Sequence, residues 1–209
     1  MPSVYIQETN REYNHMFLNR GWSLCPTVYE ADLVQFTGGS DVTPSLYGEE
    51  PHPYAHNDHV RDEIERNLYS LCIRLMKPMA GICRGGQFLN VMGGGSMWQH
   101  VNNHAIGGTH LVTNLDSNKL IPVTSTHHQM MIPGKCGQVL GKASESTLLE
   151  SMEGGRRNMV EQTLGEDIEV VWYPGDQSLC FQPHPEYLDK DSLCQRWYFD
   201  LIERYLNVS

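Results

Sequence analysis

The chain has 209 residues and a formal net charge of −10. Its length suits one domain, residues 1–209, with a substantial core. The acidic balance argues against nucleic acids and anionic membranes as partners, and no apolar run approaches the roughly 20 residues that a membrane-spanning helix needs.

The first part of the chain alternates between strand-like and helix-like segments. Its first eight residues lack a basic segment before an apolar core, so we expect a strand there instead of a secretory signal. Apolar residues recur at helical spacing before Pro78. These residues are Ile64, Leu68, Leu71, Cys72 and Leu75. The predicted strands are 4–7, 23–28, 31–37 and 78–82, and the predicted helices are 12–20, 61–76 and 87–92.

The second half is richer in strand-like segments, at 111–115, 139–143, 168–172 and 179–182. It ends in an amphipathic helix with an expected buried stripe of Leu193, Trp197, Leu201, Ile202 and Tyr205. The polar region 144–166 is typical of an elaborated surface loop or short hairpin. Together these elements predict an α/β fold with three layers: a mostly parallel central sheet, helices on both faces, and a small antiparallel region in the second half.

The six cysteines contain no Cys-x-x-Cys pair, which argues against a thiolate zinc site. Cys72, Cys180 and Cys194 have apolar neighbours and are expected to be packing residues. The chain is long and sparse in cysteine for a disulfide-stapled scaffold. We therefore expect reduced cysteines and a cytoplasmic location.

The segment around Cys83 is the most informative in the chain. A short apolar run ends there in Gly-x-Cys-x-Gly, with Gly81 and Gly85 on either side. This pattern is typical of a nucleophile elbow, where a strand turns sharply into a helix through a strained conformation. The N-terminus of the following helix favours a thiolate. Alone, such a cysteine is more often a small packing residue.

A second signal follows about a hundred residues later, where His184 comes after another apolar run and Glu186 lies two residues beyond it. The histidine could take or hold the proton of the Cys83 thiol, and the glutamate could orient the imidazole. The two signals together predict a Cys-His-Glu hydrolase.

Four segments resemble class I glutamine amidotransferases, and they are most similar to the branch of gamma-glutamyl-gamma-aminobutyrate hydrolases and related gamma-glutamyl hydrolases. They follow the family order along the chain. They are the glycine loop Gly38–Glu49, the helix lead-in Asp58–Glu65, the nucleophile region Gly81–Gly95 and the Ser-x-His-His-Gln segment Ser125–Gln129. The resemblance implies a flavodoxin-like fold and an enzyme that needs neither a cofactor nor a metal.

The resemblance also implies roles for the catalytic residues. Cys83 would form a gamma-glutamyl thioester, His184 would protonate the departing amine and later activate water, and Glu186 would fix the imidazole tautomer. Backbone N–H groups of Gly38, Gly39 and Arg84 would stabilise the oxyanion.

Three further roles are expected around the substrate. Gln87 would line the pocket for the glutamyl group, or else lie on the helix surface or cap the glycine turn. The Arg84 side chain would bind the glutamyl carboxylate or form a structural ion pair. His128 would lie near the site, in a segment that either faces His184 or forms hydrogen bonds within the core.

The histidine-rich segments do not predict a metal site. His52, His56 and His59 have the spacing of a helical face, but two prolines there disfavour a helix start. His127 and His128 are adjacent, so in a strand they point to opposite faces.

Three functions remain open at this point. The first is a stand-alone hydrolase of gamma-glutamyl amides, with a small gamma-glutamyl conjugate or glutamine as substrate. The second is a glutaminase subunit that delivers ammonia to a separate synthetase or ligase. The third is a catalytically silent binding module, which the intact Cys83, His184 and Glu186 disfavour.

The sequence departs from the gamma-glutamyl hydrolase pattern in two places, and the amine that the enzyme would release is therefore not defined by the resemblance. The stretch before Gly38 is shorter than in gamma-glutamyl hydrolases, and residues 143–146 lack the Asp-Gly turn of that branch. The oligomeric state does not follow from the sequence.

Overall fold

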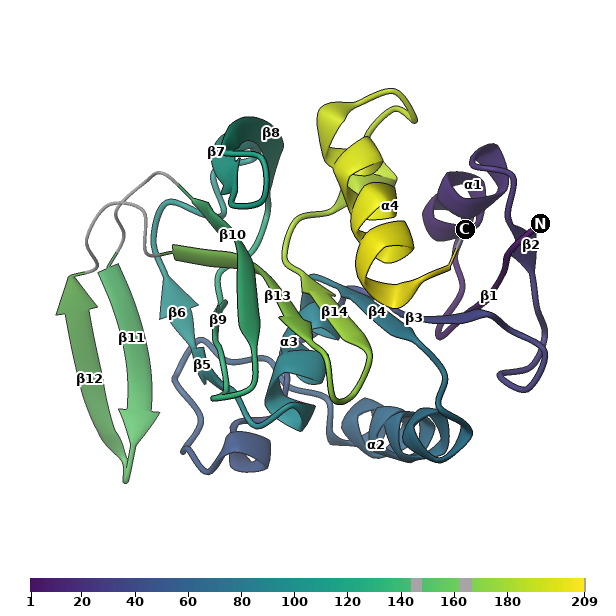
Figure 1. The fold of residues 1–209 in the computed structure, drawn as a ribbon. Coiled ribbons are helices and arrows are strands. Elements are labelled where there is room, and N and C mark those ends of the chain that lie inside the picture. The colour runs from purple at the N-terminus through teal and green to yellow at the C-terminus, as the bar shows by residue number, and fades with distance from the viewer. Residues whose placement is uncertain (144–147, 162–166, 209) are drawn as a thin grey trace.

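The computed structural model describes residues 1–143, 148–161 and 167–208, and a nine-stranded sheet forms its centre (Figure 1). In spatial order the strands are β2 (Ser23–Leu24), β1 (Ser3–Ile6), β3 (Leu33–Phe36), β4 (Met79–Ile82), β14 (Ser178–Phe181), β13 (Asp167–Tyr173), β10 (Gln138–Ala143), β7 (Gly108–Asn114) and β8 (Lys119–Ser125). Strands from β2 through β14 pair in parallel, and those from β14 through β8 pair antiparallel.

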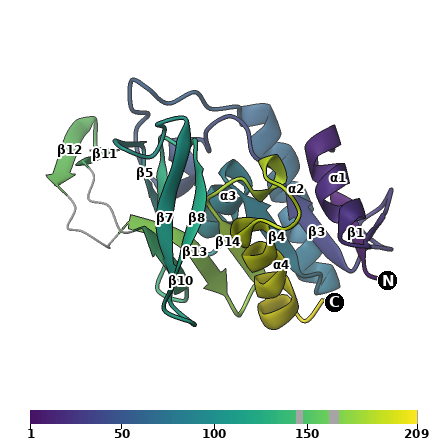
Figure 2. The ribbon, with the colours of Figure 1, turned by 90° about the horizontal axis from the view of Figure 1, so that it is seen from above.

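Helices cover both faces of the parallel half (Figures 1 and 2). The α1 helix (Arg11–Asn19) and the C-terminal α4 helix (Leu193–Leu206) share one face, and α2 (His59–Leu75) and α3 (Arg84–Met92) share the other. Two short 3₁₀ helices complete this part, η1 (Pro44–Tyr47) and η2 (Pro185–Tyr187). The expected three-layer α/β fold is confirmed.

The strand pleat divides the core into two apolar layers. On β4, Ala80 and Ile82 pack towards α1 and α4, whereas Met79 packs towards α2 and α3. Successive side chains point to opposite faces, so a strand covered on both sides is apolar throughout. All four residues of β3 and of β4 are buried accordingly.

Two small sheets accompany the main sheet, and the first of them packs against α3 and β13. One pairs β5 (Ser96–Trp98) with β9 (Met130–Ile132), and the other joins β6 (His100–Val101), β11 (Leu148–Glu153) and β12 (Arg156–Glu161). The β11–β12 hairpin projects from the body of the molecule (Figure 2). The short hairpin expected within 144–166 is therefore present, while 144–147 and 162–166 lie outside the described residues.

Several sequence-based boundaries need correction. The second strand is shorter than expected and ends two residues before Pro26, whose ring carries no N–H for a ladder. The antiparallel strands extend the main sheet, and β8 contains Pro122 at the sheet edge, where the missing N–H is tolerated.

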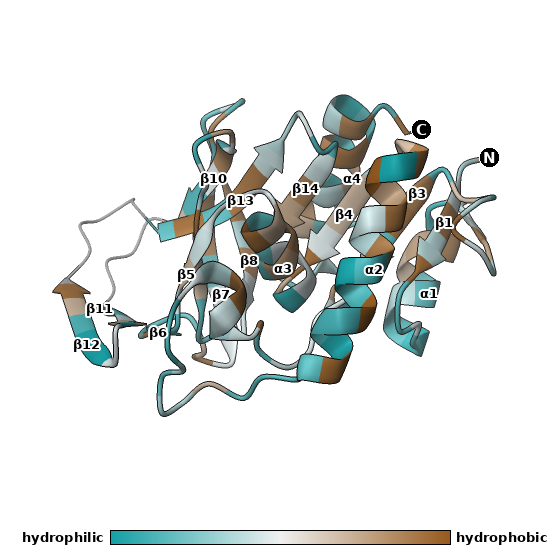
Figure 3. Cartoon of the chain, turned by 90° about the horizontal axis from the view of Figure 1, so that it is seen from below, coloured by the Kyte–Doolittle hydropathy of each residue, from teal (hydrophilic) through white to brown (hydrophobic). Residues whose placement is uncertain are grey.

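Two helix stripes also differ from expectation. Ile64 of α2 and Leu193 of α4 are exposed, at 53% and 51%. The buried face of α2 instead carries Arg61, Asp62 and Glu65, and Figure 3 shows this helix as largely hydrophilic. These charged side chains are buried because they pair with one another and with α3, a tertiary requirement that apolar periodicity does not report. None of the helices in the described residues is long and apolar enough to cross a membrane.

Candidate functional site

The backbone at Cys83 has the strained geometry of a nucleophile elbow. The residue lies between β4 and α3, with φ 49° and ψ −112°. A non-glycine residue at positive φ costs of order 1–3 kcal/mol and persists only where its surroundings fix it. The Cys83 N–H donates to the carbonyl of Phe181 at 2.8 Å, and the Cys83 carbonyl accepts from Gln87 N–H at 2.9 Å. The elbow is thus held from both sides.

Close backbone packing explains the glycines around Cys83. A Cβ on Gly81 would clash with the Gly85 carbonyl group, and a Cβ on Gly85 would clash with the carbonyl group of Phe36 on β3. A Cβ on Gly86 would lie 2.9 Å from the Phe181 nitrogen. The spacing that predicted the elbow is therefore required by the approach of α3 to the sheet.

His184 reaches Cys83 from the adjacent strand. Phe181 on β14 pairs with Ile82 on β4, so the two chain segments leave the sheet side by side. The His184 N–H donates to Thr124 Oγ1 at 2.7 Å, and the His184 Nδ1 lies 2.5 Å from Glu186 Oε1.

The surroundings of His184 favour its protonated, imidazolium form. Both side chains are buried, and a hydrogen bond joins Cys83 to His184. Burial lowers the pKa of His184, but the negative charge of Cys83, the hydrogen bond to its sulfur and the carboxylate of Glu186 outweigh burial and raise the pKa to about 11. Tyr187 stacks on the His184 ring with centroids 4.9 Å apart.

The glycine loop lies against the side chain of His184. A Cβ on Gly38 would lie 2.8 Å from His184 Cε1, and the Gly38 N–H donates to the Tyr13 hydroxyl at 2.8 Å. Burial, and then the charge of Glu186, raise the pKa of Tyr13 well above its usual range, so this hydroxyl stays protonated. Gly39 adopts φ 151°, and any Cβ there would clash with the Arg61 guanidinium. The Gly38 N–H is therefore already hydrogen-bonded to the buried Tyr13 hydroxyl.

The Arg84 side chain is a structural ion pair. It is 1% exposed, and its Nη2 lies 2.5 Å from Asp62 Oδ1. Its Nη1 contacts Glu65, and its Nε donates to the Ser40 carbonyl at 3.1 Å. These contacts occupy the guanidinium, so only the backbone N–H of Arg84 is left to bind a substrate oxygen. Arg84 is the first residue of α3, and the first amides of a helix have no acceptor within the helix.

Replacing Arg84 with methionine should lower the free energy of unfolding by about 3–5 kcal/mol, because buried Asp62 loses its counter-charge and buried Glu65 keeps only Arg61. Chemical denaturation measures this loss, with Arg74→Met on exposed helix surface as the matched control. A raised KM with unchanged stability would instead assign the side chain to substrate binding.

Gln87 connects the elbow helix to the other predicted segments. Its Nε2 donates to Gln182 Oε1 at 3.2 Å and to the Gln129 carbonyl at 3.5 Å, and it is 3% exposed. His128 contacts Asp41 in the glycine-loop segment, with 3.0 Å between its Nε2 and the carboxylate, and this hydrogen bond raises the pKa of His128. Gln87 is therefore buried in a polar network, and His128 joins two of the resembling segments.

The histidines of the two histidine-rich segments have separate partners. His52 pairs with Glu150 at 2.9 Å. His127 and His128 have different partners, but both lie between β8 and β9, so the alternation expected of a strand does not apply to them. His127 lies in a cluster with His104, His110 and Glu169, whose possible ligand atoms are all within 4.8 Å of one another. No local sequence pattern predicts this cluster, since its members are far apart along the chain.

Tyr13, Thr124 and Tyr187 also contact the site, although no motif in the sequence predicts a role for them. The cysteine expectations fit the structure, in which all six cysteines are free and Cys72, Cys180 and Cys194 are buried.

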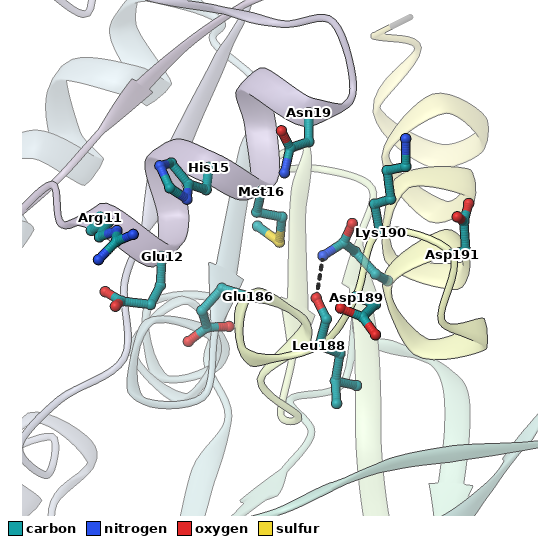
Figure 4. A pocket seen from close by; sticks show the side chains of 11 residues that line it. Arg11, Glu12, His15, Met16, Asn19, Glu186, Leu188, Asp189, Lys190 and Asp191 are labelled. Atoms are coloured by element: carbon teal, nitrogen blue, oxygen red, sulfur yellow. Dashed lines mark hydrogen bonds between the residues drawn. The ribbon is translucent and has the colours of Figure 1, made fainter.

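A cavity of about 560 Å³ lies on the Glu186 side of the site, between α1 and residues 186–191 (Figure 4). It is lined by polar side chains that include Glu12, His15 and Lys190. Cys83 does not line it. This cavity therefore does not receive the scissile bond.

Comparison with known proteins fits this geometry. Residues 16–154 match the family model described as Peptidase C26. The chain therefore belongs to the Peptidase C26 family, which is class I glutamine amidotransferase-like. A glutamine amidotransferase-like protein of Lactococcus lactis, YvdE, is 32% identical over 146 residues, covering 69% of this chain and 57% of the relative. The chain spans 57–63% of the two Lactococcus lactis relatives that it matches.

Solved structures show the same fold at low sequence identity. PurLQS from Thermotoga maritima matches with a TM-score of 0.66 and 16% identity, covering 98% of this chain and 99% of that chain. A protein from Thermoplasma acidophilum that is described as one subunit of GMP synthase matches with a TM-score of 0.56 and 14% identity, covering 96% and 91%. These likenesses support the class I glutamine amidotransferase fold.

Proposed function

We propose that the chain is a cysteine-dependent hydrolase of gamma-glutamyl amide bonds, acting on glutamine or on gamma-glutamyl conjugates. The family supports an enzyme that acts on amide bonds. The observation that carries the proposal is the buried Cys83–His184–Glu186 arrangement at the ends of two paired strands.

The reaction begins with attack of the Cys83 thiolate on the amide carbon. The imidazolium of His184 protonates the departing amine, which leaves a gamma-glutamyl thioester. Neutral His184 then takes a proton from water, and the resulting attack releases glutamate and the thiol. Glu186 holds Nδ1 of the ring, so the other ring nitrogen faces the reaction.

Two amides are placed to stabilise the tetrahedral oxyanion. The Arg84 N–H lies at the start of α3, where the helix dipole adds positive potential. The glycine loop supplies the second donor, for which Gly39 is available while Gly38 binds Tyr13. One such donor typically contributes about 3–4 kcal/mol to lowering the barrier.

A glutaminase subunit is the second candidate function. One structural neighbour is described as a subunit of GMP synthase, and its fold covers nearly all of this chain. A glutaminase of this kind has the same triad and delivers its ammonia to a separate synthetase or ligase. The glycine loop and Ser-x-His-His-Gln segments favour the stand-alone hydrolase, because they resemble the gamma-glutamyl hydrolase branch.

A substrate panel separates the two candidates. The purified chain is assayed for glutamate release from glutamine and from gamma-glutamyl amides of putrescine, GABA and several amino acids, with Cys83→Ser as the blank. Turnover of one conjugate far above glutamine is expected. Labelling of Cys83 by a glutamine-analogue electrophile without turnover would favour the glutaminase subunit, and failure of both labelling and turnover would contradict either function.

A further inference from the structure

The four-residue histidine–glutamate cluster has the geometry of a metal site. His110 lies on β7, Glu169 lies on β13, His127 follows β8, and His104 lies between β6 and β7. A single carboxylate oxygen, Glu169 Oε1, is 3.2 Å from His104 Nδ1, from His110 Nε2 and from His127 Nε2. The four residues are 0–3% exposed. Three imidazoles therefore converge on one oxygen in the interior of the protein.

Hydrogen bonds account for only part of this convergence. His110 Nε2 makes a hydrogen bond to Glu169 Oε1, whereas His104 Nδ1 and His127 Nε2 contact the same oxygen as ion pairs that require a protonated ring. Within the described part of the chain, neither of these two ring nitrogens has a hydrogen bond of good geometry. Buried polar atoms left unpaired are costly and rare in native proteins. A shared ligand would satisfy the two ring nitrogens together.

Outer partners orient two of the three rings. His104 Nε2 lies 2.8 Å from Asp167 Oδ2, and His127 Nδ1 lies 2.8 Å from the Gln129 carbonyl. Both oxygens are acceptors, so the outer nitrogen of each of these rings carries a proton. Burial lowers the pKa of His127, so the lone pair of its Nε2 points into the cluster. Burial also lowers the pKa of His104, but the carboxylates of Asp167 and Glu169 outweigh burial and raise it to about 9, so a metal at His104 Nδ1 would replace a proton. Metal-binding histidines have this arrangement of an outward N–H bound to a carboxylate or carbonyl.

We propose that His104 Nδ1, His110 Nε2, His127 Nε2 and Glu169 Oε1 bind a divalent transition-metal ion, with zinc as the best fit. Zinc takes nitrogen and carboxylate ligands at about 2.0–2.1 Å in a tetrahedron, which places neighbouring ligand atoms roughly 3.3 Å apart. The observed 3.2 Å separations are close to this value. The remaining separations reach up to 4.8 Å, so the longest would have to shorten by about 1.5 Å as the rings move onto the ion.

Burial and the ligand count make this a structural site. Four protein ligands fill a tetrahedron, and the buried position leaves no open coordination for a substrate. The metal would tie together β7, β13 and the segment after β8.

The site also supports the wall behind the catalytic histidine. The Glu169 carbonyl accepts from Gln182 N–H at 2.8 Å, two residues before His184. Thr124 on β8 holds the His184 N–H. The proposed metal therefore stabilises the scaffold of His184 and takes no part in the chemistry.

Metal content and cobalt spectroscopy test the proposal. The full chain is purified with a tag that contains no histidine, and bound zinc is counted by mass spectrometry. The Cys83→Ser background keeps metal away from the catalytic thiol. We expect about one zinc per chain, a Tm that falls after chelation and recovers with zinc, and a tetrahedral cobalt spectrum without thiolate bands.

Matched variants locate the ion. Glu169→Gln and His110→Gln should lose most of the zinc, whereas His52→Gln, which disrupts another buried histidine–glutamate pair, should retain it. Should the cluster variants fail to fold, cobalt titration of the Cys83→Ser chain alone still decides. Substoichiometric zinc together with no cobalt spectrum would overturn the proposal, and so would zinc retained in a folded Glu169→Gln chain.

Discussion

Replacing Cys83 with alanine is expected to lower kcat/KM for amide hydrolysis by about 10⁴-fold or more. The substitution removes the sulfur that contacts His184 and hence the atom that would form the thioester. It keeps a Cβ at the strained elbow, so the chain should still fold. Steady-state kinetics measure the loss, and circular dichroism checks the fold.

Cys136→Ala is the matched control, because Cys136 is the exposed free cysteine. It should leave kcat/KM unchanged. In the unmodified chain, a glutamine-analogue electrophile should label Cys83 before Cys136, since Cys83 contacts a histidine that can take its proton. Faster labelling of Cys136 would contradict activation of Cys83 by His184.

Replacing Glu186 with glutamine is expected to lower kcat by about 10²–10⁴-fold. The carboxylate lies 2.5 Å from His184 Nδ1 and helps to raise the pKa of His184 to about 11. Without this carboxylate the pKa of His184 falls. The imidazolium that protonates the departing amine is then deprotonated at a lower pH. The alkaline limb of the kcat/KM profile should therefore move towards neutral pH.

The pH dependence of folding stability should shift in Glu186→Gln in the same direction as the activity profile. The folded-state pKa of His184 lies above its ordinary value of about 6.5, so its contribution to stability is fully present below that pH and disappears as pH rises through about 11. In Glu186→Gln the contribution should vanish earlier. Thermal unfolding between pH 6 and 11 measures this, with exposed Glu203→Gln as control. An unshifted alkaline limb would remove Glu186 from the role of orienting His184.

The parallel half of the fold and the reactive centre were predictable because their signals are local. Gly81, Cys83 and Gly85 lie within five consecutive residues, and short-range backbone packing requires those glycines. His184 and Glu186 are also close in sequence, and both follow a buried strand. Apolar runs that end at a turn predict the strands that bring these segments together.

Other features depend on contacts between distant residues. The burial of Glu65 follows from Arg84 on another helix, and no pattern within α2 indicates it. The bond from Gly38 to Tyr13 likewise joins separate elements. His104, between β6 and β7, contacts Glu169 on the distant strand β13, and nothing in the local sequence around either residue specifies this contact.

The pairing of Ile82 with Phe181 has a consequence for how the enzyme would lose activity on heating. Cys83 and His184 follow strands at the centre of the sheet, where backbone amides are expected to exchange with solvent only through global opening. The distance between the Cys83 sulfur and the His184 imidazole is then fixed by the strands that open last. Inactivation by heat should coincide with cooperative melting of the sheet, and fraying of the outer β11–β12 hairpin should leave the catalytic pair in register.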